Sequence, residues 1–149
     1  MRAVPQFGER QGGRVYADRP AAFGILEREG KIALVRIVKT DGASWHDLPG
    51  GGVDPGETPE QGVVREFGEE AGLQVATRSS FGVADQFFIN TEGLAWNNRS
   101  VFFSLDLLAE APALKVEDDH TLMWLEPEAA IRILRHDSHA WAVAAWMRS

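Results

Sequence analysis

Three glutamates are spaced so that they could hold a divalent metal ion on one face of a helix. Glu66, Glu69 and Glu70 stand at i, i+3 and i+4, so a helix would place all three carboxylates on the same side. Because like charges at this spacing repel one another, we expect a positive partner to neutralise them. A hard cation such as Mg²⁺ takes carboxylate oxygens as ligands and commonly joins them to substrate phosphates. The alternative is a solvated acidic face, which is the commoner origin of an isolated pattern of this kind.

Residues just before this cluster could orient it. Arg65 can reach Glu69 four residues later, or it can bend back to Glu57 in the preceding loop. The run 50–52 is three consecutive glycines, which allow the backbone to approach other groups closely. A carbonyl in that run could supply one more oxygen ligand, so the stretch from Gly50 onward carries the donors for a metal site.

The element that must position these carboxylates is a helix over 58–71. The Thr58 hydroxyl can cap the first turn, Pro59 suits the first helical position, and Gln61 completes a capping-box pattern. Gly72 supplies the stop, because a glycine readily adopts the left-handed conformation that ends a helix.

The remaining pattern predicts strands on both sides of this helix and further helices at the C-terminus. Apolar runs predict strands over 15–26 (broken near 18–20), 31–39, 81–89, 99–108 and 120–125, with a short extended piece over 45–49, followed by helices over 127–134 and 138–147. A mixed sheet covered by helices is the simplest packing of this order, which places the chain in the α/β class of α+β type. We expect one domain over residues 1–149, with 1–14 as a loosely ordered lead-in.

Composition excludes several classes of function. The chain has 149 residues, 15 basic and 22 acidic side chains and a formal charge of −7, which disfavours a nucleic-acid polymer or an anionic membrane surface as partner. There is no cysteine, and therefore no disulfide, zinc–thiolate site or cysteine nucleophile. No apolar run is long enough to span a bilayer, and no signal-peptide pattern opens the chain, so a cytoplasmic location is expected.

The spacing around the three glutamates matches a known family motif. The pattern is Gly51, five residues, Glu57, seven residues, Arg65-Glu66-Phe67, one residue, Glu69-Glu70, one residue, Gly72-Leu73. This is the Nudix box, and the chain resembles the Nudix hydrolases; the run 58–66 is similar to MutT-like members. The resemblance implies an α/β/α sandwich around a mixed sheet, with the box forming a loop, a helix and a second loop.

The resemblance also implies roles for the residues of the box. Glu66, Glu69 and Glu70 would hold Mg²⁺ or Mn²⁺ together with the carbonyl of Gly50. Glu57 and Arg65 would orient the loop and the helix, and Glu66 or Glu69 would take the proton of the attacking water. The intact set argues against a box that has lost its chemistry.

The family reaction is the hydrolysis of a nucleoside diphosphate linked to another group. We expect a nucleoside triphosphate pyrophosphohydrolase that releases a nucleoside monophosphate and pyrophosphate. The alternatives are an ADP-ribose or nucleotide-sugar pyrophosphatase and a non-catalytic nucleotide-binding regulator. The segment 87–91 lacks both the proline and the tyrosine that mark the ADP-ribose and dinucleoside polyphosphate subtypes.

Further candidates for substrate binding lie outside the box. Arg36 stands where the family often places a phosphate-contacting base, although a surface arginine is an equal alternative. Asp118 is one choice within the acidic run 117–119, whose other interpretation is a polar turn. Trp96, in a polar stretch predicted to be a loop, could line the substrate pocket or a contact in the homodimer that the resemblance leads us to expect. The four histidines show no metal-ligand spacing and receive no role.

Overall fold

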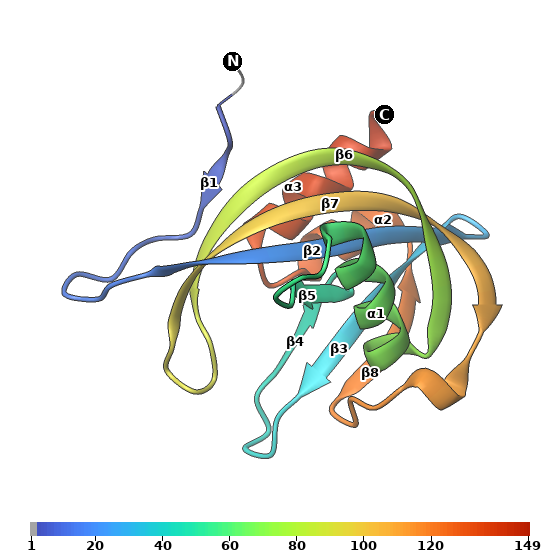
Figure 1. The fold of residues 1–149 in the computed structure, drawn as a ribbon, viewed down its shortest axis with the longest axis horizontal. Coiled ribbons are helices and arrows are strands. Elements are labelled where there is room, and N and C mark those ends of the chain that lie inside the picture. Colours follow the sequence, from blue (N-terminus) through green and yellow to red (C-terminus); the bar gives the residue numbers. More distant parts are fainter. Residues whose placement is uncertain (1–2) are drawn as a thin grey trace.

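The computed structural model describes residues 3–149 as one curved mixed sheet with helices on both sides (Figure 1). The strands are β1 (Gln6–Phe7), β2 (Ala17–Arg28), β3 (Lys31–Val38), β4 (Ser44–Asp47), β5 (Gly50–Gly52), β6 (Leu73–Ile89), β7 (Ala95–Glu110) and β8 (His120–Leu125). The helices are α1 (Pro59–Ala71), the 3₁₀ helix η1 (Pro112–Leu114), α2 (Pro127–Ile133) and α3 (Asp137–Met147). None of these helices is long and apolar enough to cross a membrane.

Strand β2 is the centre of the sheet. It runs parallel to β7 over ten residue pairs and pairs antiparallel with β5 and, at its C-terminal end, with β3. Strand β3 in turn pairs antiparallel with β4 and β8. Strands β6 and β7 form a long antiparallel arch over one side of the molecule (Figure 1). The glycines of β5 are therefore held against the buried part of β2.

Both faces of the sheet are buried, and the alternation of side chains along β2 divides them. Ala21, Phe23 and Ile25 belong to a core cluster that includes Ala142 and Val143 of α3. Ala22 and Leu26 point the other way, into a second cluster that includes residues of α1. Helix α1 thus covers one face, and α2 and α3 cover the other (Figure 1). The predicted α/β/α sandwich around a mixed sheet is confirmed.

The local signals at the ends of α1 act as predicted. Thr58 is the N-cap, its side chain accepts a hydrogen bond from the backbone of Gln61, and the Gln61 side chain accepts one from the backbone of Thr58. Gly72 ends the helix at φ 66°, in the left-handed region. Helix α1 therefore starts and stops through interactions confined to residues 58–72.

Several strand boundaries differ from those predicted. Strand β6 begins at Leu73 rather than residue 81, because the polar stretch after α1 still pairs with the end of β7 through register shifts at β-bulges. Strand β7 begins at Ala95 rather than residue 99. The predicted break near residues 18–20 is absent: Pro20 stays within β2, and its carbonyl accepts the backbone N–H of Val53. Within the predicted lead-in, β1 pairs parallel with β6.

A histidine of α3 is buried in the core between the sheet and the C-terminal helices. His139 is 1% exposed, and its ring lies 4.4 Å from that of Phe23, centroid to centroid. The backbone N–H of Leu48 donates to its Nδ1 at 3.1 Å. Burial, with positive charge nearby at Arg135, lowers the pKa of His139 well below its usual value, so the imidazole is neutral in the folded protein.

This burial predicts a pH-dependent contribution to stability. Below about pH 6.5 the unfolded chain protonates this imidazole and the folded chain does not, so folding loses about 1.4 kcal/mol per pH unit on acidification. In His139→Asn, the amide oxygen can still accept the Leu48 N–H but cannot titrate. The stability advantage of the wild type over this variant should therefore shrink from pH 6.5 to pH 5, as measured by urea unfolding. A difference that stays constant over this range would contradict a buried neutral imidazole.

Candidate active site

A pocket of about 460 Å³ opens beside the first glycines of the box and the acidic face of α1. Its floor is formed by the backbone of Gly50 and Gly51 and by the carboxylates of Glu66 and Glu70. The rest of the lining comes from β2, from the β3–β4 hairpin, from the β6–β7 hairpin, from the start of β8 and from the segment between α2 and α3. The lining therefore combines residues close to the box with residues far from it in the sequence.

The glycines of β5 allow α1 to approach the sheet closely. A Cβ atom at Gly51 would lie 3.0 Å from Oε1 of Glu66, and one at Gly50 would lie 2.2 Å from the carbonyl oxygen of Ala22. The backbone N–H of Gly50 donates to Oε1 of Glu70 at 3.0 Å. A side chain at Gly51 would press on Glu66 and one at Gly50 would press on the backbone of β2, so the site requires glycine at both positions.

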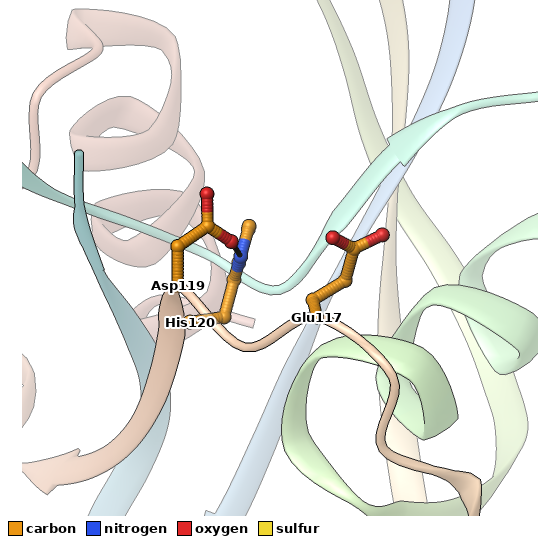
Figure 2. Close-up of side chains that lie close together, drawn as sticks. All are labelled: Glu117, Asp119 and His120. Atoms are coloured by element: carbon orange, nitrogen blue, oxygen red, sulfur yellow. Dashed lines mark hydrogen bonds and ion pairs between the residues drawn. The ribbon is translucent and has the colours of Figure 1, made fainter. Parts of the chain in front are cut away.

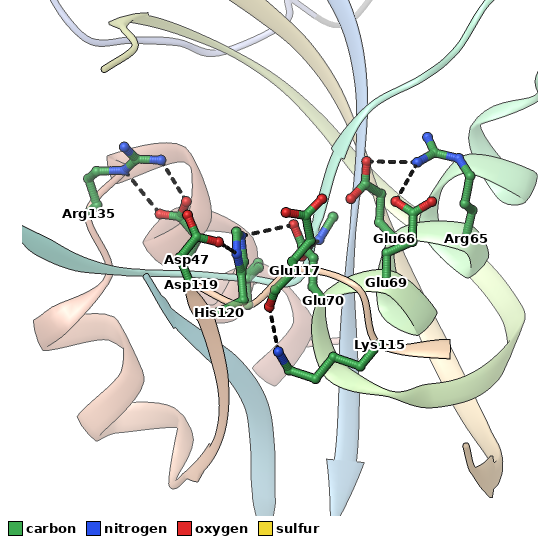
Figure 3. A network of polar contacts seen from close by, with 12 residues as sticks. Asp47, Arg65, Glu66, Glu69, Glu70, Lys115, Glu117, Asp119, His120 and Arg135 are labelled. Atoms are coloured by element: carbon green, nitrogen blue, oxygen red, sulfur yellow. Dashed lines mark hydrogen bonds and ion pairs between the residues drawn. The ribbon is translucent and has the colours of Figure 1, made fainter. Parts of the chain in front are cut away.

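Arg65 is the hub of the polar network on α1 (Figure 3). Its Nε and Nη2 donate to the two carboxylate oxygens of Glu57 at 2.8 and 3.0 Å. Its Nη1 lies 3.1 Å from Oε1 of Glu66 and 3.1 Å from Oε2 of Glu69, and its Nη2 also donates to the carbonyl of Gly52. Both contacts that the spacing allowed, to Glu57 and to Glu69, are present together. One guanidinium thus joins the loop, β5 and the acidic face of α1.

The positive charge around these carboxylates is too small to balance their negative charge. Burial, together with repulsion from Glu70 and Glu69, raises the pKa of Glu66 to about 8, although Arg65 opposes this shift. Burial also raises the pKa of Glu70, against hydrogen bonds from His120 and the backbone of Gly50. By contrast, the hydrogen bonds from Arg65 lower the pKa of Glu57. The negative charge left uncompensated lies at Glu66 and Glu70, which are the two carboxylates that line the pocket.

The donor set on α1 therefore fits a hard divalent cation. Glu66, Glu69 and Glu70 offer carboxylate oxygens from one helix face. Glu70 is buried and Glu66 partly so, at an energetic cost that a bound cation would offset. Gly50 is held next to Glu70 by its own N–H. These residues could hold such an ion.

A second set of donors lies at the start of β8. Oxygen atoms of Glu117 and Asp119 and a ring nitrogen of His120 all lie within 4.8 Å of one another, a spacing compatible with a bound cation (Figure 2). His120 Nδ1 is 2.7 Å from Oδ1 of Asp119, and Nε2 is 3.4 Å from Oε2 of Glu70. Although burial opposes it, hydrogen bonding to Glu70 and Asp119 raises the pKa of His120. The imidazole thus bridges the β8 end and the buried carboxylate of α1 (Figure 3).

The structure brings some of the predicted substrate-binding residues to the pocket and not others. Trp96 lines the pocket, although it belongs to β7 and not to a loop. Arg36 is exposed and absent from the lining: alternation along β3 sends its side chain away from that of Ile37, which does line the pocket. Asp118 is also exposed, in the turn before β8, and its neighbour Asp119 makes the contacts to the site instead.

Several pocket residues carried no signal in the sequence. The guanidinium of Arg135 forms two hydrogen bonds to Asp47, at 3.1 and 2.6 Å, and lies 4.6 Å from the ring centroid of Trp45. Arg19 reaches the pocket from β2. His120 is the exception: it directly follows the acidic run 117–119, which could have indicated its place in the site. The partners of the others are up to 88 residues away in the chain, so spacing alone could not find them.

Comparisons with known proteins agree with this geometry. A family model, the NUDIX domain, matches residues 17–147. A protein named ADP-ribose pyrophosphatase from Methanocaldococcus jannaschii is 36% identical over 99 residues, which cover 66% of this chain and 56% of that protein. A protein named CTP pyrophosphohydrolase from Escherichia coli is 30% identical over 112 residues, covering 72% of this chain and 76% of that protein. The chain thus spans little more than half the length of the archaeal relative.

A solved structure shares the fold. A NUDIX hydrolase from Nitrosomonas europaea superposes with a TM-score of 0.72 at 19% identity, over 88% of this chain and 89% of that one. The resemblance inferred from the box is confirmed by the family match over most of the chain.

The hub position of Arg65 predicts a large cost for its removal. Arg65→Gln leaves Glu57, Glu66 and Glu69 without their shared partner, so the free energy of unfolding should fall by roughly 2–4 kcal/mol. Chemical unfolding measures this loss. Arg132→Gln, at an exposed position of α2, is the matched control and should change stability by less than about 0.5 kcal/mol. Equal effects of the two substitutions would refute the hub role.

The uncompensated charge predicts how the protein responds to a metal. Mn²⁺ at about 100 times its dissociation constant should stabilise the wild type by about 2.7 kcal/mol, which corresponds to a rise in melting temperature of about 5–10 °C. Glu66→Gln should lose most of this rise, yet its metal-free form should be at least as stable as the wild type, because the substitution removes a carboxyl group whose ionisation is opposed by burial and by Glu70 and Glu69. The control is Glu60→Gln, at an exposed position of the same helix, which should keep the full rise. A full rise in Glu66→Gln would exclude Glu66 as a ligand.

Proposed function

The chain belongs to the Nudix family, and on that premise we propose that it is a metal-dependent hydrolase that cleaves a phosphoanhydride bond in a nucleoside diphosphate derivative. The observation that carries this proposal is the meeting of Glu66, Glu70 and the β5 backbone on the floor of one pocket. A solvated acidic face would not bury two carboxylates or place them against glycines. The intact set from Glu57 to Glu70 also disfavours a binding regulator without catalysis.

In this proposal Glu66, Glu69 and Glu70 hold Mg²⁺ or Mn²⁺ together with the Gly50 carbonyl. A bound divalent cation neutralises phosphate charge and lowers the pKa of a coordinated water. Arg65 and Glu57 keep the loop and α1 in register, so that the carboxylates face the substrate without rearrangement. They act as positioning residues.

The proton of the attacking water goes to a carboxylate of α1. Of the two candidates, Glu66 lines the pocket and Glu69 is not part of the lining, which favours Glu66 as the general base. The water oxygen forms a bond to phosphorus while the bridging P–O bond breaks, and the electron pair of that bond leaves with the departing phosphate. The products are two phosphate-containing fragments.

The substrate we propose is a nucleoside triphosphate, cleaved to a nucleoside monophosphate and pyrophosphate. The relative named CTP pyrophosphohydrolase supports it, and the match covers 76% of that protein. The second candidate is ADP-ribose or a nucleotide sugar, which is favoured by the more similar relative named ADP-ribose pyrophosphatase. The aromatic side chains of Trp45, Phe88 and Trp96 in the pocket lining suit a base or a sugar in either case.

A substrate panel tests the proposal. It contains the common and oxidised nucleoside triphosphates, ADP-ribose, nucleotide sugars and diadenosine polyphosphates, each with and without metal, with products identified by chromatography. We expect metal-dependent release of pyrophosphate and a monophosphate from one triphosphate, with a rate at least 100-fold lower in Glu66→Gln and in Glu70→Gln and unchanged in Glu60→Gln.

Two other results would change the assignment. Two monophosphate products from a diphosphate conjugate would move the substrate to the ADP-ribose or nucleotide-sugar class. No turnover of any compound, or an unchanged rate in Glu66→Gln, would refute the proposed chemistry.

A further inference from the structure

Arg19, on β2, is held at the pocket by residues of β7 and β5. Its Nη1 donates to Oδ1 of Asn98 on β7 at 3.2 Å, and its guanidinium carbon lies 5.8 Å from the ring centroid of Trp96. A Cβ atom at Gly52 would lie 2.8 Å from its Nη2, so the third glycine of β5 leaves the space that the guanidinium occupies. Gly51 does the same for Glu66. Two consecutive glycines thus make room for a carboxylate and for an arginine.

Arg19 differs from the other cations that line this pocket. Lys39 is paired with Asp119 at 2.8 Å, Arg135 with Asp47, and His120 with Glu70 and Asp119. Within residues 3–149, no carboxylate lies within 4.0 Å of the Arg19 guanidinium. Burial lowers the pKa of Arg19, and the charge of Glu66 raises it, but a guanidinium stays protonated throughout. A half-buried positive charge with a neutral amide as partner is costly for the free protein.

The chemistry of this position selects an anionic ligand. A guanidinium has five N–H donors in a planar fork that matches phosphate oxygens, and the bond to Asn98 uses one of them. The other charged groups of the lining are already paired or, like Glu66 and Glu70, negative. Arg19 is thus the cationic group that the fold leaves available to an anion entering beside the metal-binding carboxylates.

We infer that Arg19 binds an oxygen of the substrate's phosphate chain that the metal does not hold. The inference rests on the proposed function for the identity of the substrate, but it assigns a residue outside the box. Arg36, which the sequence suggested for this contact, lies outside the pocket lining. The metal would hold the phosphate chain from the side of α1, and Arg19 would hold it from the side of β2.

The test is binding of inorganic pyrophosphate in the presence of Mg²⁺, measured by titration calorimetry. Arg19→Met keeps the apolar stem against Trp96 and removes the charge, and Arg19→Gln is the second variant if the first lowers the melting temperature. We expect the dissociation constant to rise at least tenfold, with a smaller rise in Arg19→Lys. The wild type should also lose more affinity than the variant between 50 and 500 mM NaCl, because an ionic contact is screened.

The matched control is Arg99→Gln. Arg99 follows Asn98 on β7 and lies opposite Pro20, but its guanidinium is outside the pocket lining and paired with Asp18 and Asp85. The dissociation constant of Arg99→Gln for pyrophosphate should stay within twofold of that of the wild type. Equal binding by the wild type and a folded Arg19 variant overturns the inference, as does a wild type that binds no pyrophosphate.

Binding is measured without turnover, which separates this inference from the proposed function. A chain that turns over no compound of the panel but loses affinity in Arg19→Met would refute the hydrolase and keep the anion contact. A wild type that hydrolyses a triphosphate, together with an Arg19→Met variant that binds pyrophosphate equally well, would keep the hydrolase and refute the anion contact.

Discussion

The concentration of negative charge on one face of α1 is the constraint on which the site depends. Glu66, Glu69 and Glu70 share a helix face with one arginine, and burial makes their mutual repulsion stronger than it would be in water. The structure compensates only in part: Arg65 joins Glu57, Glu66 and Glu69, while the backbone of Gly50 and the imidazole of His120 reach Glu70. The negative charge that remains uncompensated faces the pocket, and a cation bound there would stabilise the folded protein.

The sheet supplies the rigidity that this arrangement needs. Strand β5 is only three residues long, yet it is fixed by pairing with β2, whose alternating side chains enter both cores. Because β5 carries no side chains, α1 can approach it closely. The same strand pairing brings Arg19 from β2 beside Asn98 of β7, so the sheet that positions the carboxylates also positions a cation across from them.

The proposed function requires an acidic protein to bind phosphates, and such a protein must reverse the sign of its own electrostatic field at the site. This chain has a formal charge of −7, and the pocket floor is formed by carboxylates. A bound divalent cation supplies one reversal. The walls add positive charge through two arginines. Arg135 is neutralised by the buried Asp47 and lies near the ring of Trp45. Arg19 has no carboxylate partner within residues 3–149. Chemistry and selectivity thus come from different parts of the fold: the box carries the carboxylates, and distant strands shape the rest of the pocket.

The sequence alone determined what depends on neighbours in the chain. Thr58, Gln61 and Gly72 set the ends of α1, the i, i+3 and i+4 spacing set its acidic face, and Arg65 lay within reach of Glu57 and Glu69; all of these interactions span eight residues or fewer. Only the tertiary structure decided which distant residues complete the pocket. The contact of Arg19 with Asn98 depends on the register of β2 and β7, and a shift of one residue would turn either side chain to the opposite face. The contacts of His120 with Glu70 and of Arg135 with Asp47 depend on how α1 and the segment after α2 pack against the sheet. That is why Arg36 could be proposed from its position in the chain, while alternation along β3 keeps it out of the pocket. The order of residues alone determines the periodicity of a helix or strand. The register between strands is determined by the packing of the whole sheet between its two helical layers.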